Sequence, residues 1–106
     1  MLKPILSALF LISIFPSPAI RTDKKFIYSP GTKAGGNYTP GILMDGTLYV
    51  SGQLGLDANG KLPADFEGEV KQSLDNIGAV LKEAGMSPAD VVSVQVYLPM
   101  VNYFNE

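Results

Sequence analysis

The residues best suited to chemistry are a serine and a glycine at the end of a predicted strand. Asp45-Gly46 is a tight-turn dipeptide, and an alternating run over residues 47–50 follows it. Together they predict a β-hairpin whose second strand ends at Ser51-Gly52. A small ligand can meet a hydroxyl and exposed backbone groups at such a strand end. Ser51 has no histidine or obvious lysine base near it in the sequence, so it is a poor nucleophile.

A tyrosine stands in the glycine-rich stretch that precedes this hairpin. Residues 31–41 hold four glycines and a proline around Tyr38, a composition that predicts a loop. The loop is either a plain surface connection or a contact for a ligand. Tyr38 accordingly either offers its hydroxyl to that ligand or packs its ring on the hairpin. Gly35-Gly36 lacks the spacing of a phosphate-binding loop.

Composition excludes several kinds of site. The chain has 106 residues and contains no Cys, His or Trp. It therefore has no thiol nucleophile, no imidazole base and none of the usual thiolate or imidazole metal ligands. Eight scattered basic residues and a net charge of −2 form no basic stripe, so we expect no nucleic-acid partner. The length predicts a single domain.

The N-terminal segment has the pattern of an export signal. Lys3 precedes an apolar run over residues 5–15, and small residues then lead to a cleavage position after Ala19. We predict a signal peptide at residues 1–19 and a periplasmic or secreted protein, with the domain at residues 26–106. The run is too short for a stable membrane span. The alternatives are a buried element of the domain in a cytoplasmic protein, or an uncleaved membrane anchor.

Periodicity predicts one clear helix and one strong strand. Apolar residues recur at three- and four-residue steps between Asp65, a capping residue, and Gly85, a left-handed stop. Gly78 inside the helix predicts close packing on a sheet. Residues 91–98 alternate as a strand whose apolar face would cover the helix. The apolar positions of the helix are Phe66, Val70, Leu74, Ile77, Leu81 and Ala84.

The order of these motifs resembles the RidA/YjgF family of reactive-intermediate deaminases over about residues 31–106. The resemblance implies an α+β, chorismate-mutase-like fold, a β-sheet with helices on one face. It also implies a homotrimer with a ligand cleft at each subunit interface. The motifs that carry it are Tyr38 in its loop, Leu48-Tyr49-Val50-Ser51-Gly52-Gln53, Gln72-Ser73-Leu74-Asp75-Asn76-Ile77 and Asp90-Val91-Val92.

Members of this family hydrolyse enamine and imine intermediates, such as 2-iminobutanoate and 2-iminopropanoate, to 2-oxo acids and ammonia. They need no cofactor and no metal. By resemblance, Tyr38, Ser51 and Gly52 would bind the imino acid substrate, while Gln53 would hold structure. The resemblance assigns no catalytic residue within these 106 positions.

The remaining family site residues fall beyond Glu106: an asparagine, an arginine that holds the substrate carboxylate and a late glutamate. A guanidinium suits that task because it binds a carboxylate with two parallel hydrogen bonds. The chain's one arginine is Arg21, beside the expected cleavage site. We therefore interpret the sequence as C-terminally truncated, and we expect these residues alone not to accelerate ammonia release. The alternatives are a non-catalytic binding or trimeric interaction module of the same fold, or an inactive fragment.

Overall fold

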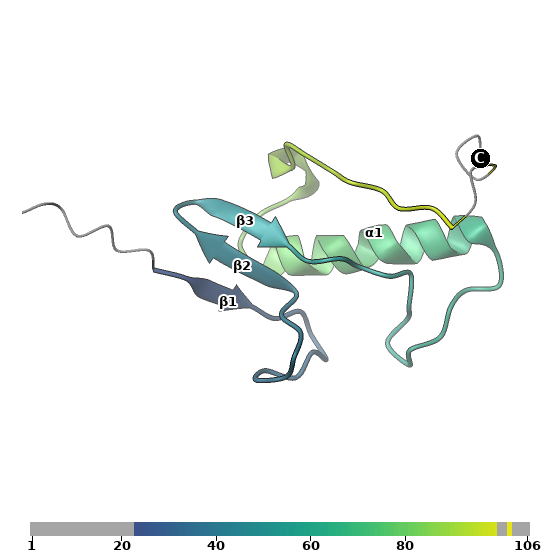
Figure 1. The fold of residues 1–106 in the computed structure, drawn as a ribbon, viewed down its shortest axis with the longest axis horizontal. Coiled ribbons are helices and arrows are strands. Elements are labelled where there is room, and N and C mark those ends of the chain that lie inside the picture. Colours follow the sequence, from purple (N-terminus) through teal and green to yellow (C-terminus); the bar gives the residue numbers. More distant parts are fainter. Residues whose placement is uncertain (1–22, 100–101, 103–106) are drawn as a thin grey trace, which may run out of the picture.

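The computed structural model describes residues 23–99 and residue 102 of the chain (Figure 1). The predicted signal peptide at residues 1–19 lies outside the described residues. The described part holds an antiparallel sheet of order β1-β2-β3, a long helix and a short 3₁₀ helix. Their bounds are β1 Lys25–Ile27, β2 Gly41–Met44, β3 Thr47–Val50, α1 Phe66–Glu83 and η1 Pro88–Asp90.

The predicted hairpin is confirmed. Asp45 has φ 50° and Gly46 has φ 78°, the two positive angles of a turn whose twist matches the flanking strands. The pairing of β2 with β3 runs from Met44 opposite Thr47 to the far end of both strands. The turn therefore fixes the register that brings the end of β3 beside the start of β2.

The two faces of the sheet differ in what covers them. Leu48 is half-buried on the face that meets α1. On the opposite face the register aligns Phe26, Ile42 and Tyr49 in one row across the three strands. Phe26 is 54% exposed and Tyr49 is 57% exposed. The sheet thus has one packed face and one open aromatic face.

Both predicted caps of α1 are confirmed. The Asp65 side chain accepts a hydrogen bond from the Gly68 N–H at 2.8 Å, which satisfies one of the orphan donors of the first turn. At the other end Gly85 has φ 73°, and the Met86 N–H donates to the Leu81 carbonyl at 2.8 Å. These are the features of a left-handed helix stop.

The core lies where the sheet meets the C-terminal half of α1. Val80, which falls outside the predicted apolar stripe, is fully buried, and Ile27 is 3% exposed. A Cβ atom at Gly41 would lie 2.9 Å from Val80 Cγ1, so Gly41 is the position that permits close packing. The prediction for Gly78 is wrong, because a Cβ there would meet no described atom within 4 Å beyond the helix's own backbone and chain neighbours.

The predicted strand at residues 91–98 is not a strand in this structure. Val92 is 97% exposed and Val94 is 65% exposed. Residues 92–98 make no backbone hydrogen bond within the described part of the chain. A strand needs a paired neighbour for its backbone groups, and none is supplied here. We call residues 91–98 the extended segment.

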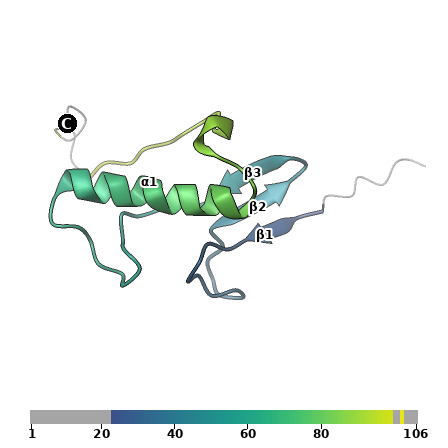
Figure 2. The same cartoon turned by 180° about the vertical axis from the view of Figure 1, so that it is seen from behind.

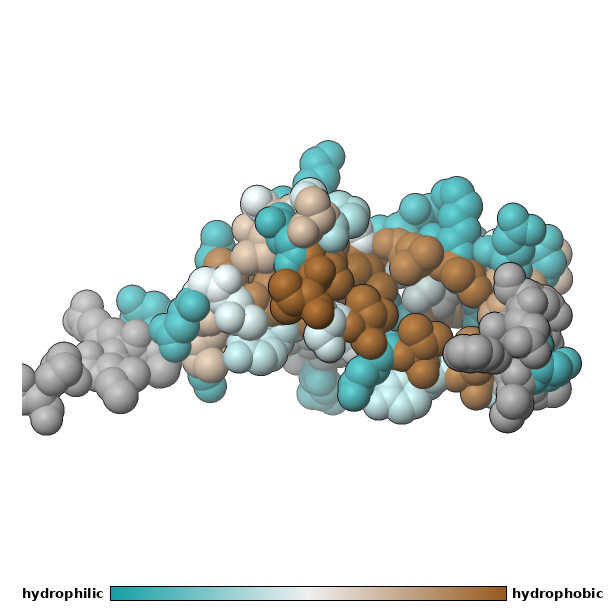
Figure 3. Space-filling view, turned by 90° about the horizontal axis from the view of Figure 1, so that it is seen from above, coloured by the Kyte–Doolittle hydropathy of each residue, from teal (hydrophilic) through white to brown (hydrophobic). Residues whose placement is uncertain are grey.

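The extended segment also fails to cover α1 as predicted. It runs back in the direction opposite to the helix (Figures 1 and 2). Leu74 on the helix remains 59% exposed, and Val70 is 40% exposed. Seen from above, the space-filling view shows hydrophobic side chains gathered at the surface (Figure 3). Only the C-terminal end of the predicted apolar stripe is buried.

Candidate functional site

A small hydrogen-bonded network of uncharged groups lies just beyond the C-terminal end of β3. The Tyr38 hydroxyl donates to the Gly52 carbonyl at 3.1 Å, across fourteen positions of sequence. The Gln53 side-chain amide lies 2.6 Å from the same hydroxyl oxygen and 3.2 Å from the Ser51 carbonyl. The structure therefore brings together all three residues predicted to bind substrate. It adds Gln53 as the group that connects them.

Ser51 ties the loop to the strand. Its Oγ lies 2.9 Å from the Thr39 carbonyl and 3.0 Å from the Pro40 carbonyl, and its N–H donates to the Pro40 carbonyl at 2.9 Å. A serine hydroxyl has one hydrogen, so that hydrogen is committed to the loop backbone. Its oxygen can still accept a hydrogen bond from a ligand. The geometry supports a lining role for Ser51, and among the described residues its hydroxyl contacts only backbone carbonyls and no base.

Gly52 gives the site its open side. The residue is exposed, and a Cβ atom built on it would meet nothing within 4 Å. Its N–H has no hydrogen-bond partner among the described residues. Gly52 thus presents a free donor beside the carbonyl that Tyr38 holds. An incoming ligand with an acceptor atom can use that donor.

Helix α1 anchors the chain that follows the site. Ser73 Oγ donates to the Gln53 carbonyl at 2.9 Å. Asn76 Nδ2 donates to the Leu54 carbonyl at 2.8 Å and to the Leu56 carbonyl at 3.0 Å. Three backbone carbonyls outside any strand are satisfied in this way, as backbone acceptors away from a sheet require. The anchoring fixes the site relative to the helix.

The chain matches known proteins over this same region. Residues 29–106 match the family model described as endoribonuclease L-PSP. The chain belongs to this family. It is also 46% identical over 72 residues to the 2-iminobutanoate/2-iminopropanoate deaminase of Bos taurus, which covers 66% of this chain and 53% of that protein. The human protein of the same name is 42% identical over 72 residues, with the same two coverages.

Solved structures agree with these matches. RidA from an Antarctic Psychrobacter aligns with a TM-score of 0.58 and 34% identity, over 64% of this chain and 57% of that one. A Rid-family protein from Yersinia pestis aligns with a TM-score of 0.55 and 37% identity, over 61% and 54%. The RidA/YjgF resemblance and the α+β fold class are thereby confirmed. The chain spans about half the length of the curated relatives it matches.

The sequence alone does not single out the anchoring residues of this RidA-family chain. Gln72 Nε2 donates to Asn76 Oδ1 at 3.0 Å, which orients the Asn76 amide toward the segment after the site. In the sequence, residues 72, 73 and 76 stand out only as part of the family motif. The sequence does contain a clue to this role. Residues three or four positions apart lie on the same side of a helix, and residues 72, 73 and 76 make that side polar.

The segment over residues 53–56 approaches α1 most closely at Gly55. The residue is buried, and a Cβ atom built on it would collide with the Glu69 backbone carbonyl and lie 2.5 Å from Glu69 Cγ. A backbone carbonyl within a helix cannot move aside as a flexible side chain can. Glycine is therefore required here by space, and this requirement is not visible in the sequence.

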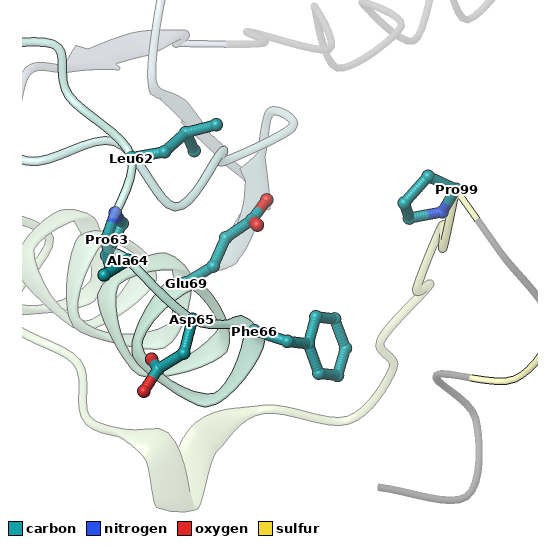
Figure 4. A pocket seen from close by; sticks show the side chains of 7 residues that line it. All are labelled: Leu62, Pro63, Ala64, Asp65, Phe66, Glu69 and Pro99. Carbon is teal, nitrogen blue, oxygen red and sulfur yellow. The ribbon is translucent and has the colours of Figure 1, made fainter.

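The hollows on the described surface lie elsewhere. One of about 280 Å³ opens at the N-terminal end of α1, where Pro99 returns beside the helix (Figure 4). Asp65 and Glu69 both line it, and two carboxylates disfavour an anionic ligand. Tyr38, Ser51 and Gly52 line neither this hollow nor a second one of about 360 Å³ around Asp65, Gly68 and Lys71. The hydrogen-bonded strand end remains the candidate site.

Neither a metal-binding cluster nor a membrane-spanning helix occurs in the described part of the chain. No group of three or more His, Cys, Asp or Glu residues stands together there in a way that could hold a metal ion. None of the helices described has both the length and the apolar character to cross a bilayer. The groups that the structure places at the strand end are hydroxyl, amide and backbone groups.

Proposed function

We propose that this chain forms one wall of a deaminase site that hydrolyses 2-imino acids to 2-oxo acids and ammonia. The observation that carries the proposal is the convergence of Tyr38, Ser51 and Gly52 at the open end of β3. Family membership and the names of the bovine and human relatives supply the reaction class. The proposed substrates are 2-iminobutanoate and 2-iminopropanoate.

Hydrolysis of an imine requires few protein groups. Water adds to the carbon of the C=N bond, protons move to the nitrogen, and the C–N bond breaks as the C=O bond forms and ammonia leaves. The Tyr38 hydroxyl and the Gly52 N–H can donate hydrogen bonds to the substrate as charge moves during this addition. In this proposal Ser51 lines the cleft and keeps the Tyr38 loop beside the strand.

The substrate carboxylate needs a cation that this wall does not carry. Tyr38, Ser51, Gly52 and Gln53 are all uncharged at neutral pH. We propose that the cation comes from an opposing wall, supplied by family sequence beyond the half that this chain matches. The reaction uses no metal and no cofactor in this proposal, since addition of water to an imine is acid–base chemistry.

We also propose that the domain assembles as a homotrimer through its open sheet face. The row of Phe26, Ile42 and Tyr49 supports this, because an exposed aromatic row on a sheet marks an interaction surface. Tyr49→Lys should shift the protein toward monomer in light scattering coupled to size-exclusion chromatography. An unchanged trimer in that variant, or a monomeric parent chain, would refute this part of the proposal.

The word endoribonuclease in the family description suggests a different substrate. The composition of this chain argues against RNA, since it has no histidine, its basic residues are scattered and its net charge is −2. RNA binding relies on clustered lysine and arginine that neutralise phosphates. The uncharged strand-end site fits a small polar molecule better.

The proposal is tested with imine generated in situ by a dehydratase and trapped by semicarbazide. The proteins compared are the 106-residue chain, an extended chain and its Tyr38→Phe variant. The extended chain continues after residue 98 with the corresponding C-terminal part of the bovine relative. We expect imine hydrolysis by the extended chain, a loss of roughly tenfold or more without the Tyr38 hydroxyl, and none by the short chain. A folded extended chain with no activity would overturn the proposal.

Export is the second part of the proposal. The charge at Lys3, the apolar run over residues 5–15 and the small residues before Ala19 support a cleaved signal peptide. We expect a periplasmic or secreted product that begins at Ile20. The intact mass of the protein isolated from its own cells decides this, and a product that retains Met1 contradicts it.

A further inference from the structure

The orientation of the Gln53 amide is fixed by its neighbours. Its Nε2 atom lies 3.2 Å from the Ser51 carbonyl, and a carbonyl oxygen can only accept. The NH₂ end of the amide must therefore face this group. The same nitrogen lies 2.6 Å from the Tyr38 hydroxyl oxygen, so Gln53 is the donor in that contact as well.

This assignment determines what the Tyr38 hydroxyl can do. Its oxygen accepts from Gln53, and its single hydrogen points to the Gly52 carbonyl at 3.1 Å. A hydroxyl that accepts a hydrogen bond becomes a better donor, because neighbouring hydrogen bonds polarise one another. The hydrogen held by Gly52 is thus the one that a ligand acceptor at the open strand end would take.

Gln53 itself is held at both ends. Its carbonyl accepts from Ser73 Oγ at 2.9 Å, and its side chain bridges Ser51 and Tyr38. The bridge therefore runs from α1 through one residue to a hydroxyl in a glycine-rich loop. Tyr38 is 45% exposed and residues 33–37 before it are exposed as well. Ser51 holds the loop backbone, and the Gln53 bridge is the side-chain contact that positions the hydroxyl oxygen itself.

We propose that Gln53 is a positioning residue, which fixes the Tyr38 oxygen while the hydroxyl hydrogen passes from the Gly52 carbonyl to the substrate. This deepens the proposed deaminase function and rests on it for the identity of the substrate. The Tyr38–Gly52 bond is then the resting contact of the empty site. Gln53 acts only through Tyr38 and touches no reacting atom.

The positioning is tested by NMR on the 106-residue chain with ¹³Cζ-labelled tyrosine, in which Tyr38→Phe assigns the signal. Gln53→Leu removes the donor at similar size, and Gln53→Glu keeps the shape but replaces the donor with an acceptor. Gln95→Leu is the matched control at an exposed glutamine. We expect both Gln53 variants to move the Tyr38 signal and the control to leave it in place. An unmoved signal in a Gln53 variant whose helix is intact by circular dichroism overturns the proposal.

A double-mutant cycle on imine hydrolysis in the extended chain completes the test. Gln53→Leu should lower the rate by roughly 10- to 100-fold when Tyr38 is present and have little effect on top of Tyr38→Phe. Equal losses in both backgrounds would mean that Gln53 only supports the strand end, which contradicts positioning through Tyr38. If the extended chain is inactive from the start, the deaminase proposal fails, while the NMR result still decides whether Gln53 sets the Tyr38 oxygen.

Discussion

The strand-end site and the extended segment carry the two strongest motifs of this chain. The first is held by hydrogen bonds within the described residues, and the second is not. At the site, hydrogen bonds of 2.6–3.2 Å join Tyr38 to the end of β3, and α1 anchors the chain beyond it. The extended segment over residues 91–98 has no ladder, and Val92 is 97% exposed. The first region finds its partners within the described residues, whereas the second does not.

The difference shows what each region needs in order to be ordered. The site is held by side chains that reach backbone carbonyls a short distance away. The extended segment has apolar side chains and unpaired backbone groups, which need a neighbouring strand. The chain spans about half the length of its curated relatives. A hydrogen-bonded strand end can therefore be well formed beside a segment that finds no paired neighbour among the described residues.

The largest expected effect on stability comes from Gly55→Ala, a substitution in the segment that α1 anchors. A Cβ there collides with the backbone of α1 at Glu69, so we expect a loss of about 2–3 kcal/mol in the free energy of unfolding. Urea denaturation followed by circular dichroism measures it. Gly52→Ala is the control, because its Cβ meets nothing within 4 Å, and its cost should stay below about 0.5 kcal/mol. Equal costs at the two positions would refute the close approach of this segment to α1.

The next effect compares a buried valine with an exposed one. Val80→Ala removes two methyl groups from a fully buried position, and we expect a cost of about 2 kcal/mol. Val94→Ala makes the same chemical change in the extended segment at 65% exposure, and its cost should be below about 0.5 kcal/mol. The same urea titration separates them. A larger cost at Val94 would show that the extended segment is packed in solution.

A smaller effect tests the anchor at Asn76. Asn76→Ala leaves the Leu54 and Leu56 carbonyls without their donor, and we expect a loss of about 1–2 kcal/mol. Asp75→Ala, one position away, breaks only the exposed pair with Lys71 and should cost about 0.5 kcal/mol or less. Thermal unfolding of the two variants side by side provides the measurement. A milder change at Asn76 than at Asp75 would contradict the anchoring role.

The smallest effect on stability comes from Val94→Lys. The side chain is exposed, so the free energy of unfolding should change by less than about 0.5 kcal/mol. The charge should nevertheless reduce self-association, because residues 91–98 carry no charged side chain and present an unpaired strand-like edge. Sedimentation velocity over a range of concentrations detects the change. If the parent chain and the Val94→Lys variant self-associate equally, the extended segment is not the surface through which the protein self-associates.

The features predictable from sequence were those decided over a few residues. The hairpin follows from the positive φ angles that Asp45 and Gly46 adopt, and both helix ends follow from Asp65 and Gly85. The meeting of Tyr38 with the strand end was expected from the family resemblance, since no local rule joins a loop tyrosine to a residue fourteen positions away.

The features that sequence did not predict depend on which surfaces meet. Val80 is fully buried because the packed face of the sheet lies against that side of α1, while Leu74 on the predicted stripe stays exposed. The alternation over residues 91–98 predicted a strand that the structure does not form, because pairing needs a neighbour that the described residues do not provide. Packing at Gly41 and Gly55 likewise became visible only in three dimensions.

The central claim is that the Tyr38 hydroxyl at the end of β3 takes part in imine hydrolysis. Its most direct test is the ratio of the rate of 2-iminobutanoate hydrolysis by the extended chain to the rate of its Tyr38→Phe variant, with equal helix content in both proteins. We predict a ratio of roughly ten or more. A ratio of one would contradict the account, because the strand-end network would then be structural and the chemistry would lie elsewhere.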